Sequence, residues 1–196
     1  HKGNPRFLED AITTVSNSVE RMNRLLAQLK SSVPGDRAGP LMIEEVMEEA
    51  VAECSSVTPR PRLELPARGR SVLFADRDRF VAVLGHVIQN AQDAVSKDGE
   101  VVVRLEVDGG MVRIDVVDDG VGMDGSFIRE RLFKPFDSTK GLAGMGIGAY
   151  ECREFIRALG GRVEVSSAPG RGARFSMFLP SPQHPPASVD APPGGG

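Results

Sequence analysis

Apolar residues recur at helical spacing in four stretches of the chain and alternate with polar residues in several shorter ones. The helical spacing predicts helices over about 7–30, 41–54, 77–96 and 147–159. The alternating pattern predicts strands at about 63–65, 72–74, 101–107, 111–117, 162–167 and 173–179. Glycine-containing turns join the last four strands into two hairpins, with no regular alternation of strand and helix. We therefore expect an α+β fold, a two-layer α/β sandwich with helices on one face of a sheet.

The first predicted helix, residues 7–30, carries a heptad pattern. Its apolar residues alternate in steps of four and three: Leu8, Ile12, Val15, Val19, Met22, Leu26 and Leu29. Ala11 and Leu25 widen the apolar face beyond a two-stranded seam, which favours a bundle of more than two helices. Such a helix is marginal alone and must pack either on its own domain or on a second copy. The sustained heptad favours self-association.

Composition distinguishes the segments that flank the predicted domain and excludes several classes of function. Two Pro and two Gly in residues 31–40 predict a linker, and the six Pro and three Gly from Pro180 onward predict a disordered tail. A net charge of −3 argues against non-specific nucleic-acid binding, which needs a basic face. Cys54 and Cys152 make neither a disulfide framework nor a metal site. With no apolar run of membrane-spanning length and no signal-peptide pattern, we expect a soluble, cytoplasmic chain.

The helix predicted at 77–96, with Asp76 as its N-cap, has two contrasting faces. One face is apolar and comprises Leu84, Ile88, Ala91 and Val95. The opposite face carries His86, Asn90, Asp93 and Lys97. This polar face is either simply solvated or part of a site, because the amide oxygen of Asn90 could ligate a hard cation such as Mg²⁺.

The segment Asp118–Met123 follows a predicted strand directly and reads D-D-G-V-G-M. A carboxylate at a strand end can accept a hydrogen bond from an exocyclic amine, and nearby glycines let a flat ring approach the backbone. The alternative is an ordinary turn, which Asp and Gly also favour.

A glycine-rich region, which we expect to be irregular, spans about 119–146 and contains two further motifs. In Leu132–Lys140 two aromatic residues flank a proline, which indicates an anchored loop, and Lys140 could reach a phosphate. Gly141–Gly148 leads into the last predicted helix, where unpaired N–H groups form a cradle for an anion. The pattern is neither a Walker A loop nor a Rossmann fingerprint.

In their order and spacing these motifs resemble the catalytic ATP-binding domain of sensor histidine kinases, over about residues 41–180. The resemblance implies the Bergerat sandwich fold that gyrase, heat-shock chaperones and mismatch-repair ATPases share. It also implies ATP and Mg²⁺ as cofactors.

Carried over residue by residue, the resemblance assigns Mg²⁺ to Asn90 and the adenine amino group to Asp118. The other expected nucleotide contacts are Gly120 and Gly122 beside the base, Phe133 and Phe136 in the lid, Lys140 on a phosphate, and the phosphate-facing Gly144, Gly146 and Gly148. We expect Asp93, Met123, Ser138, Thr139, Met145 and Ile147 to line the nucleotide, and His86 to join Asn90 and Lys140 as a catalytic residue.

The chain departs from the family pattern at three places. His86 stands where ATP-hydrolysing relatives carry a general-base Glu, which favours phosphoryl transfer over hydrolysis. Met145 replaces a frequent Thr or Ser, and the lid between Phe136 and Gly144 is short. The segments 137–141 and 144–151 look most like kinases tied to the bacterial exopolysaccharide and exosortase (PEP-CTERM) system.

A histidine kinase needs an acceptor histidine on a two-helix dimerisation hairpin. The chain has His1, His86 and His184, and none of them is suitably placed on such a hairpin. Helix 7–30 resembles the second helix of the hairpin, so we expect the acceptor upstream of residue 1. The expected parts are then 1–32, a partial dimerisation helix and the start of a linker, 33–180, the catalytic domain, and 181–196, the tail.

We therefore expect a kinase fragment that transfers the ATP γ-phosphoryl group to a histidine, from which it passes to a response regulator. The expected partners are ATP, that regulator and a second copy bound through helix 7–30, without nucleic acid. Contact with a membrane, the inner membrane of a bacterium, would come only through upstream segments. Two alternatives stay open: a serine kinase of the anti-sigma type on the same fold, and a non-catalytic dimeric scaffold.

Overall fold

The computed structural model describes residues 37–66, 71–108, 110–135 and 147–181. The chain divides into two units, His1–Ala38 and Gly39–Gly196, and nearly all described residues belong to the second. The predicted helix 7–30 and the predicted tail from residue 182 lie outside the described residues. The part of the chain that the structure describes contains no helix long and apolar enough to span a bilayer.

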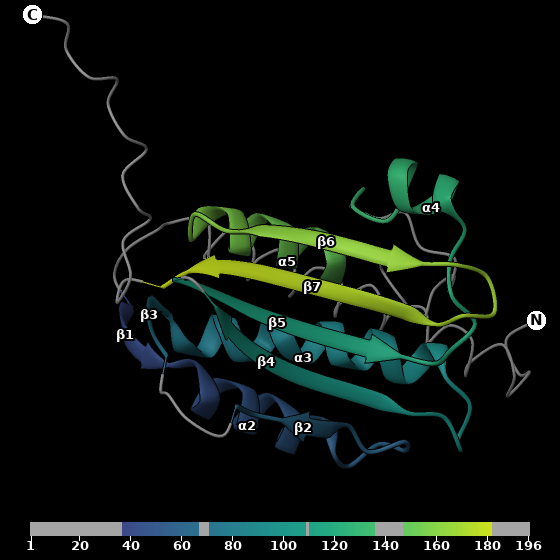
Figure 1. Cartoon of the computed structure of the whole chain (residues 1–196), viewed down its shortest axis with the longest axis horizontal. Coiled ribbons are helices and arrows are strands. Elements are labelled where there is room, and N and C mark those ends of the chain that lie inside the picture. The colour runs from purple at the N-terminus through teal and green to yellow at the C-terminus, as the bar shows by residue number, and fades with distance from the viewer. Residues whose placement is uncertain (1–36, 67–70, 109, 136–146, 182–196) are drawn as a thin grey trace, which may run out of the picture. The chain divides into compact units, whose positions relative to one another are not determined.

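The second unit is built on a mixed five-stranded sheet with the strand order β2-β4-β5-β7-β6 (Figure 1). Its strands are β2 (Arg62–Glu64), β4 (Val101–Asp108), β5 (Met111–Asp118), β6 (Arg162–Ser167) and β7 (Ala173–Pro180). β2 runs parallel to β4, and the other neighbouring strands are antiparallel. The two predicted hairpins, β4–β5 and β6–β7, are confirmed, and β7 joins them by pairing with β5.

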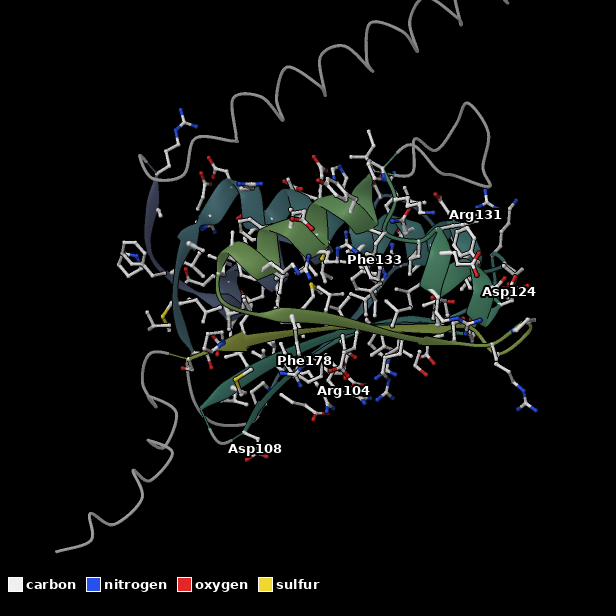
Figure 2. The ribbon with its side chains drawn as sticks, turned by 90° about the horizontal axis from the view of Figure 1, so that it is seen from above. Arg104, Asp108, Asp124, Arg131, Phe133 and Phe178 are labelled. Atoms are coloured by element: carbon white, nitrogen blue, oxygen red, sulfur yellow. The ribbon has the colours of Figure 1, made fainter. Side chains whose placement is uncertain are left out.

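Three helices cover one face of this sheet (Figures 1 and 2). They are α2 (Ile43–Cys54), α3 (Arg77–Ala94) and α5 (Gly148–Ala158). The core lies between the two layers, where the apolar side of α3 is fully buried at Phe80, Leu84 and Ile88. Phe80 meets Phe155 of α5 edge to face, with ring centroids 5.3 Å apart. The predicted two-layer α+β sandwich is confirmed.

The alternation along the strands separates this core from the other face of the sheet. Val103 and Leu105 of β4 are buried in the core, whereas Arg104 points to the opposite face, where Figure 2 shows it on the same side of the sheet as Phe178. There the Nε of Arg104 donates to Oε2 of Glu64 at 2.6 Å, a cross-strand pair from β2. On the face away from the helices, therefore, charged side chains pair with each other across neighbouring strands.

Local capping residues set the start of α3 and the end of α5. Asp76 caps α3 as predicted, because its Oδ1 accepts from the N–H of Arg79 at 3.0 Å. Gly160 ends α5 in a left-handed conformation with φ +76°, and its N–H donates to the carbonyl of Arg157 at 2.9 Å.

Two predictions about secondary structure are wrong in part. Ala38–Met42 forms a strand, β1, that pairs with β3 (Val72–Asp76), so the linker predicted at 31–40 is extended backbone at its end. The helix predicted from residue 41 begins at Ile43 instead. The buried side chain of Leu41 fits either helical or extended spacing, and an edge strand tolerates Pro40, so periodicity did not separate the two.

The region predicted to be irregular contains a short helix, α4 (Gly125–Glu130). Asp124 caps it, since its Oδ1 accepts from the N–H groups of Ser126 and Phe127 at 2.8 and 2.9 Å. α4 has no buried residue, so it leaves no apolar stripe in the sequence from which it could be predicted.

Candidate functional site

Asp118 is a buried carboxylate at the end of β5, with 9% of its surface exposed. Its Oδ1 accepts from the N–H of Gly120 at 2.9 Å. Burial raises the pKa of Asp118, an effect that the backbone N–H groups of Gly120 and Ala173 partly offset. A carboxylate has about four acceptor positions, so Asp118 keeps capacity for a further donor. This is the arrangement that the strand-end motif predicts.

The turn after Asp118 is held from two sides. The N–H of Val121 donates to the carbonyl of Ala94 at the end of α3, at 3.0 Å. On the other side, the N–H of Gly170 donates to the carbonyl of Val121 at 2.7 Å. The end of β5, the end of α3 and the β6–β7 turn are therefore one hydrogen-bonded unit, which fixes the position of Asp118.

The glycines of this turn are required by close backbone contacts. A Cβ on Gly120 would lie 2.3 Å from the carbonyl oxygen of Ala94. A Cβ on Gly122, which has φ +68°, would lie 2.0 Å from the carbonyl oxygen of Ala168. Packing alone thus explains both glycines, and their contact with a base stays a prediction.

Met123 is anchored by its backbone. Its N–H donates to Oγ of Ser167 at 2.8 Å. That hydroxyl in turn donates to the carbonyl of Gly172 at 2.6 Å. Ser167 was not predicted as a site residue, because its contact with Met123 depends on the pairing of distant segments.

The polar face of α3 is exposed as predicted. His86, Asn90 and Asp93 lie in solvent-accessible positions, while the opposite face is buried. The first residue of α5 lies against this polar face: a Cβ on Gly148 would be 3.3 Å from Nδ2 of Asn90 and 3.4 Å from Cβ of His86. The structure therefore brings His86, Asn90 and Gly148 together, although they come from two separate motifs.

Glu151 joins this group from the first turn of α5. Its Oε2 lies 3.4 Å from Nδ1 of His86, which is within ion-pair distance. Glu151 is an acidic residue in the first turn of α5, where its charge interacts favourably with the helix dipole. The sequence alone does not reveal its partner on another helix.

The first lid aromatic, Phe133, is anchored to both layers. Its ring lies 6.1 Å from that of Phe175 on β7. The guanidinium of Arg153 on α5 lies over the same ring, 4.8 Å from its centroid. Figure 2 shows Phe133 on the side of the sheet that the helices cover. The predicted anchored loop is thus present at its first aromatic residue, and Arg153 is an anchor that the motif did not indicate.

The other predicted lid and phosphate residues lie outside the described part of the chain: Phe136, Ser138, Thr139, Lys140, Gly144, Met145 and Gly146. Ile147 is described and is 7% exposed, so its side chain belongs to the packing of α5. A nucleotide contact through Ile147 stays a prediction. Among the described residues, no group of three or more His, Cys, Asp or Glu side chains is placed to hold a metal ion.

Residues 75–183 match the family model of histidine kinase-, DNA gyrase B- and HSP90-like ATPases. This match includes α3, the Asp118 turn and the closing β6–β7 hairpin, and it covers more than half of the chain. The chain belongs to this family. The description of the family makes the matched segment an ATP-binding domain.

Several similar proteins are named as bacterial sensor proteins. The C4-dicarboxylate transport sensor protein DctB of Rhizobium meliloti is 30% identical over 187 residues, which cover 91% of this chain and 30% of DctB. The sensor histidine kinase ZraS of Klebsiella oxytoca is 28% identical over 172 residues, covering 85% of this chain and 37% of ZraS. The chain thus spans well under half the length of these relatives. Together with the family match, they indicate a catalytic domain of the histidine kinase type.

Solved structures share the fold. The mycobacterial sensor histidine kinase MprB superposes with a TM-score of 0.64 at 21% identity, covering 74% of this chain and 97% of that one. The full-length ShkA structure, in complex with AMPPNP, gives 0.71 at 24% identity, covering 90% of this chain and 38% of ShkA. At this identity the likeness shows the fold, and it confirms the Bergerat sandwich that the motifs predicted.

Proposed function

We propose that the chain is the ATP-binding catalytic part of a two-component sensor histidine kinase. In this proposal it presents the γ-phosphoryl group of ATP to a histidine, and the group then passes to a response regulator. The observation that carries the proposal is the buried carboxylate of Asp118, fixed at the end of β5 in a domain of the ATPase family. The similarity to proteins named as sensors supports the kinase reading over the gyrase and chaperone branches.

The described residues fit a nucleotide at both ends. Asp118 offers a buried acceptor for the adenine amino group. A hydrogen bond from that amino group would replace the hydrogen bonds to water that the carboxylate loses on burial. At the other end Asn90 offers an exposed amide oxygen to Mg²⁺, which in nucleotide sites keeps water and phosphate oxygens as its remaining ligands. Bound Mg²⁺ supplies charge neutralisation at the phosphates. We expect Lys140, Gly144 and Gly146 to complete the phosphate end.

Phosphoryl transfer is favoured over hydrolysis because residue 86 is His and not Glu. In this proposal His86, on the exposed face of α3, is a site residue, and a histidine of the dimerisation hairpin accepts the phosphoryl group. A response regulator is the proposed partner. One structural neighbour, the histidine kinase ThkA, is in complex with the response regulator protein TrrA, at a TM-score of 0.68 and 21% identity.

We also propose the finer features that the sequence predicts. Helix 7–30 would be the second helix of a dimerisation hairpin and would pair the protein with a second copy. The part boundaries at 32/33 and 180/181 follow from this assignment. The segments 137–141 and 144–151 support membership of the PEP-CTERM-associated kinases. The last of these features is a parent protein anchored in the inner membrane of a bacterium through segments upstream of this chain.

Phosphorylation with γ-labelled ATP and Mg²⁺ tests the proposal. The chain is compared alone and extended upstream to include the dimerisation hairpin. We expect label in the extended protein that is lost in acid and stable in base, as for phosphohistidine, and no label in the chain alone. Acid-stable label would instead indicate a serine kinase. Absence of both label and ATP binding would favour a non-catalytic scaffold.

A further inference from the structure

We infer that Glu151 is a positioning residue for His86, an inference that rests on the proposed phosphoryl-transfer function. The carboxylate of Glu151 lies 3.4 Å from Nδ1 of His86, and the two side chains are 27% and 45% exposed. The pair spans two helices, α3 and α5, at the point where Gly148 lies against Asn90. It therefore stands beside the residue proposed to hold Mg²⁺.

The backbones on both sides of the pair are fixed. The N–H of Glu151 donates to the carbonyl of Ile147 at 2.8 Å, which closes the first turn of α5. One helical turn further on, Phe155 packs against Phe80 of α3. With Gly148 at the contact, where a Cβ would press on His86 and Asn90, α5 is held close enough for Glu151 to reach the imidazole.

The pairing has a chemical consequence for His86. An ionised carboxylate only accepts hydrogen bonds, so its position 3.4 Å from Nδ1 favours a proton on that nitrogen of His86. In a neutral imidazole this leaves Nε2, on the far side of the ring, as the acceptor. Glu151 thereby selects one tautomer and one ring orientation. If the carboxylate of Glu151 interacted only with the helix dipole, it would stabilise α5 but would not select a tautomer of His86.

This arrangement gives the site a histidine backed by a carboxylate. In the family pattern, residue 86 is where hydrolysing relatives place a carboxylate directly. Here the carboxylate is displaced to α5 and acts through the imidazole.

The tautomer of His86 is measured directly by long-range ¹H–¹⁵N NMR of the ¹⁵N-labelled 196-residue chain. The sample is kept at about pH 8.5, well above the ordinary pKa of histidine, and His86→Asn assigns the signals. We expect the Nδ1–H tautomer in the wild type and in Glu151→Gln, which keeps an acceptor oxygen. Glu151→Ala should shift His86 toward a mixture of tautomers. The control Glu154→Ala, an exposed carboxylate that pairs with Arg153 and Arg157, should leave His86 unchanged.

An Nε2–H tautomer in the wild type, or the same spectrum for His86 in the wild type and Glu151→Ala, would overturn the inference. Calorimetric titration with MgATP on the same samples separates it from the proposed function: a wild type that fails to bind ATP contradicts the function and not the tautomer. In the protein extended to include the acceptor, Glu151→Ala should lower kcat about tenfold with KM nearly unchanged. An equal loss of ATP binding would show a structural role instead.

Discussion

Two glycines in the β6–β7 turn provide a matched test of how the Asp118 turn is held. Gly170 and Gly172 both have left-handed backbones, with φ +69° and +67°. A Cβ on Gly170 would meet nothing within 4 Å, whereas a Cβ on Gly172 would lie 1.9 Å from the carbonyl oxygen of Asp118. Replacing each by alanine therefore separates the cost of the backbone conformation from the cost of the close contact.

The expected magnitudes follow from these two terms. An alanine in the left-handed region costs about 1 kcal/mol, and this applies to both variants. Forcing a methyl group against backbone adds about 1–3 kcal/mol for Gly172→Ala alone. With a urea m-value of about 2 kcal/mol/M, the midpoint should fall by about 0.5 M in Gly170→Ala and by about 1–2 M in Gly172→Ala.

Equilibrium urea unfolding followed by circular dichroism measures both midpoints, with the m-values compared to check that the unfolding transition is unchanged. Gly172→Ala should also weaken MgATP binding, because the shift falls on the backbone of Asp118, and Gly170→Ala should not. Equal midpoint shifts in the two variants would refute the close contact between the turn and the end of β5.

Three further predictions concern charge and anchoring. Because burial raises the pKa of Asp118, the folded chain binds this proton more tightly than the unfolded chain; the associated stability is present below the ordinary aspartate pKa and is lost as pH rises through the folded value. Urea unfolding over a pH series should show that the free energy of unfolding of the wild type falls relative to that of Asp118→Asn as pH rises through that window. A difference between the two proteins that does not change with pH would contradict this prediction. Arg153→Ala should lower the free energy of unfolding by about 0.5–1 kcal/mol through lost contact with Phe133, while Arg157→Ala, whose pair with Glu154 is exposed, should change it by less; equal losses would contradict the anchor. Asn90→Ala should abolish the Mg²⁺ dependence of ATP binding seen by calorimetry while the urea midpoint stays within error, and an unchanged Mg²⁺ dependence would exclude Asn90 as a ligand.

Features that depend on neighbouring residues could be predicted from the sequence. The two faces of α3, the Asp76 cap and the two hairpins follow from local spacing and turn residues, and the structure confirms them. The motif also indicated Asp118 correctly as a strand-end carboxylate. In contrast, β1 was missed because its short apolar pattern fits a helix as well as a strand, and α4 was missed because it buries nothing.

The contacts that organise the site could not be predicted in this way. Glu151 meets His86, and Gly172 meets Asp118, only after the two hairpins and two helices have assembled. The glycine-rich sequence suggested that Gly120 and Gly122 leave room for a ligand, whereas their Cβ positions are filled by backbone carbonyls. Sequence pattern thus identified which segments form the site, and tertiary packing decided which of their atoms touch.

We predict that Asp118 recognises the adenine of ATP, and calorimetric titration with nucleotide tests this claim most directly. The matched control is Asp119→Asn: Oδ1 of Asp119 accepts from the N–H of Glu100 at 2.8 Å, a contact that an asparagine oxygen preserves. The wild type and Asp119→Asn should bind MgATP equally and prefer it to MgGTP, which lacks the amino group at that position. Asp118→Asn should bind MgATP about 10- to 100-fold more weakly, the loss of one hydrogen bond to a charged group. Unchanged affinity in Asp118→Asn, with the fold intact by circular dichroism, would contradict the claim.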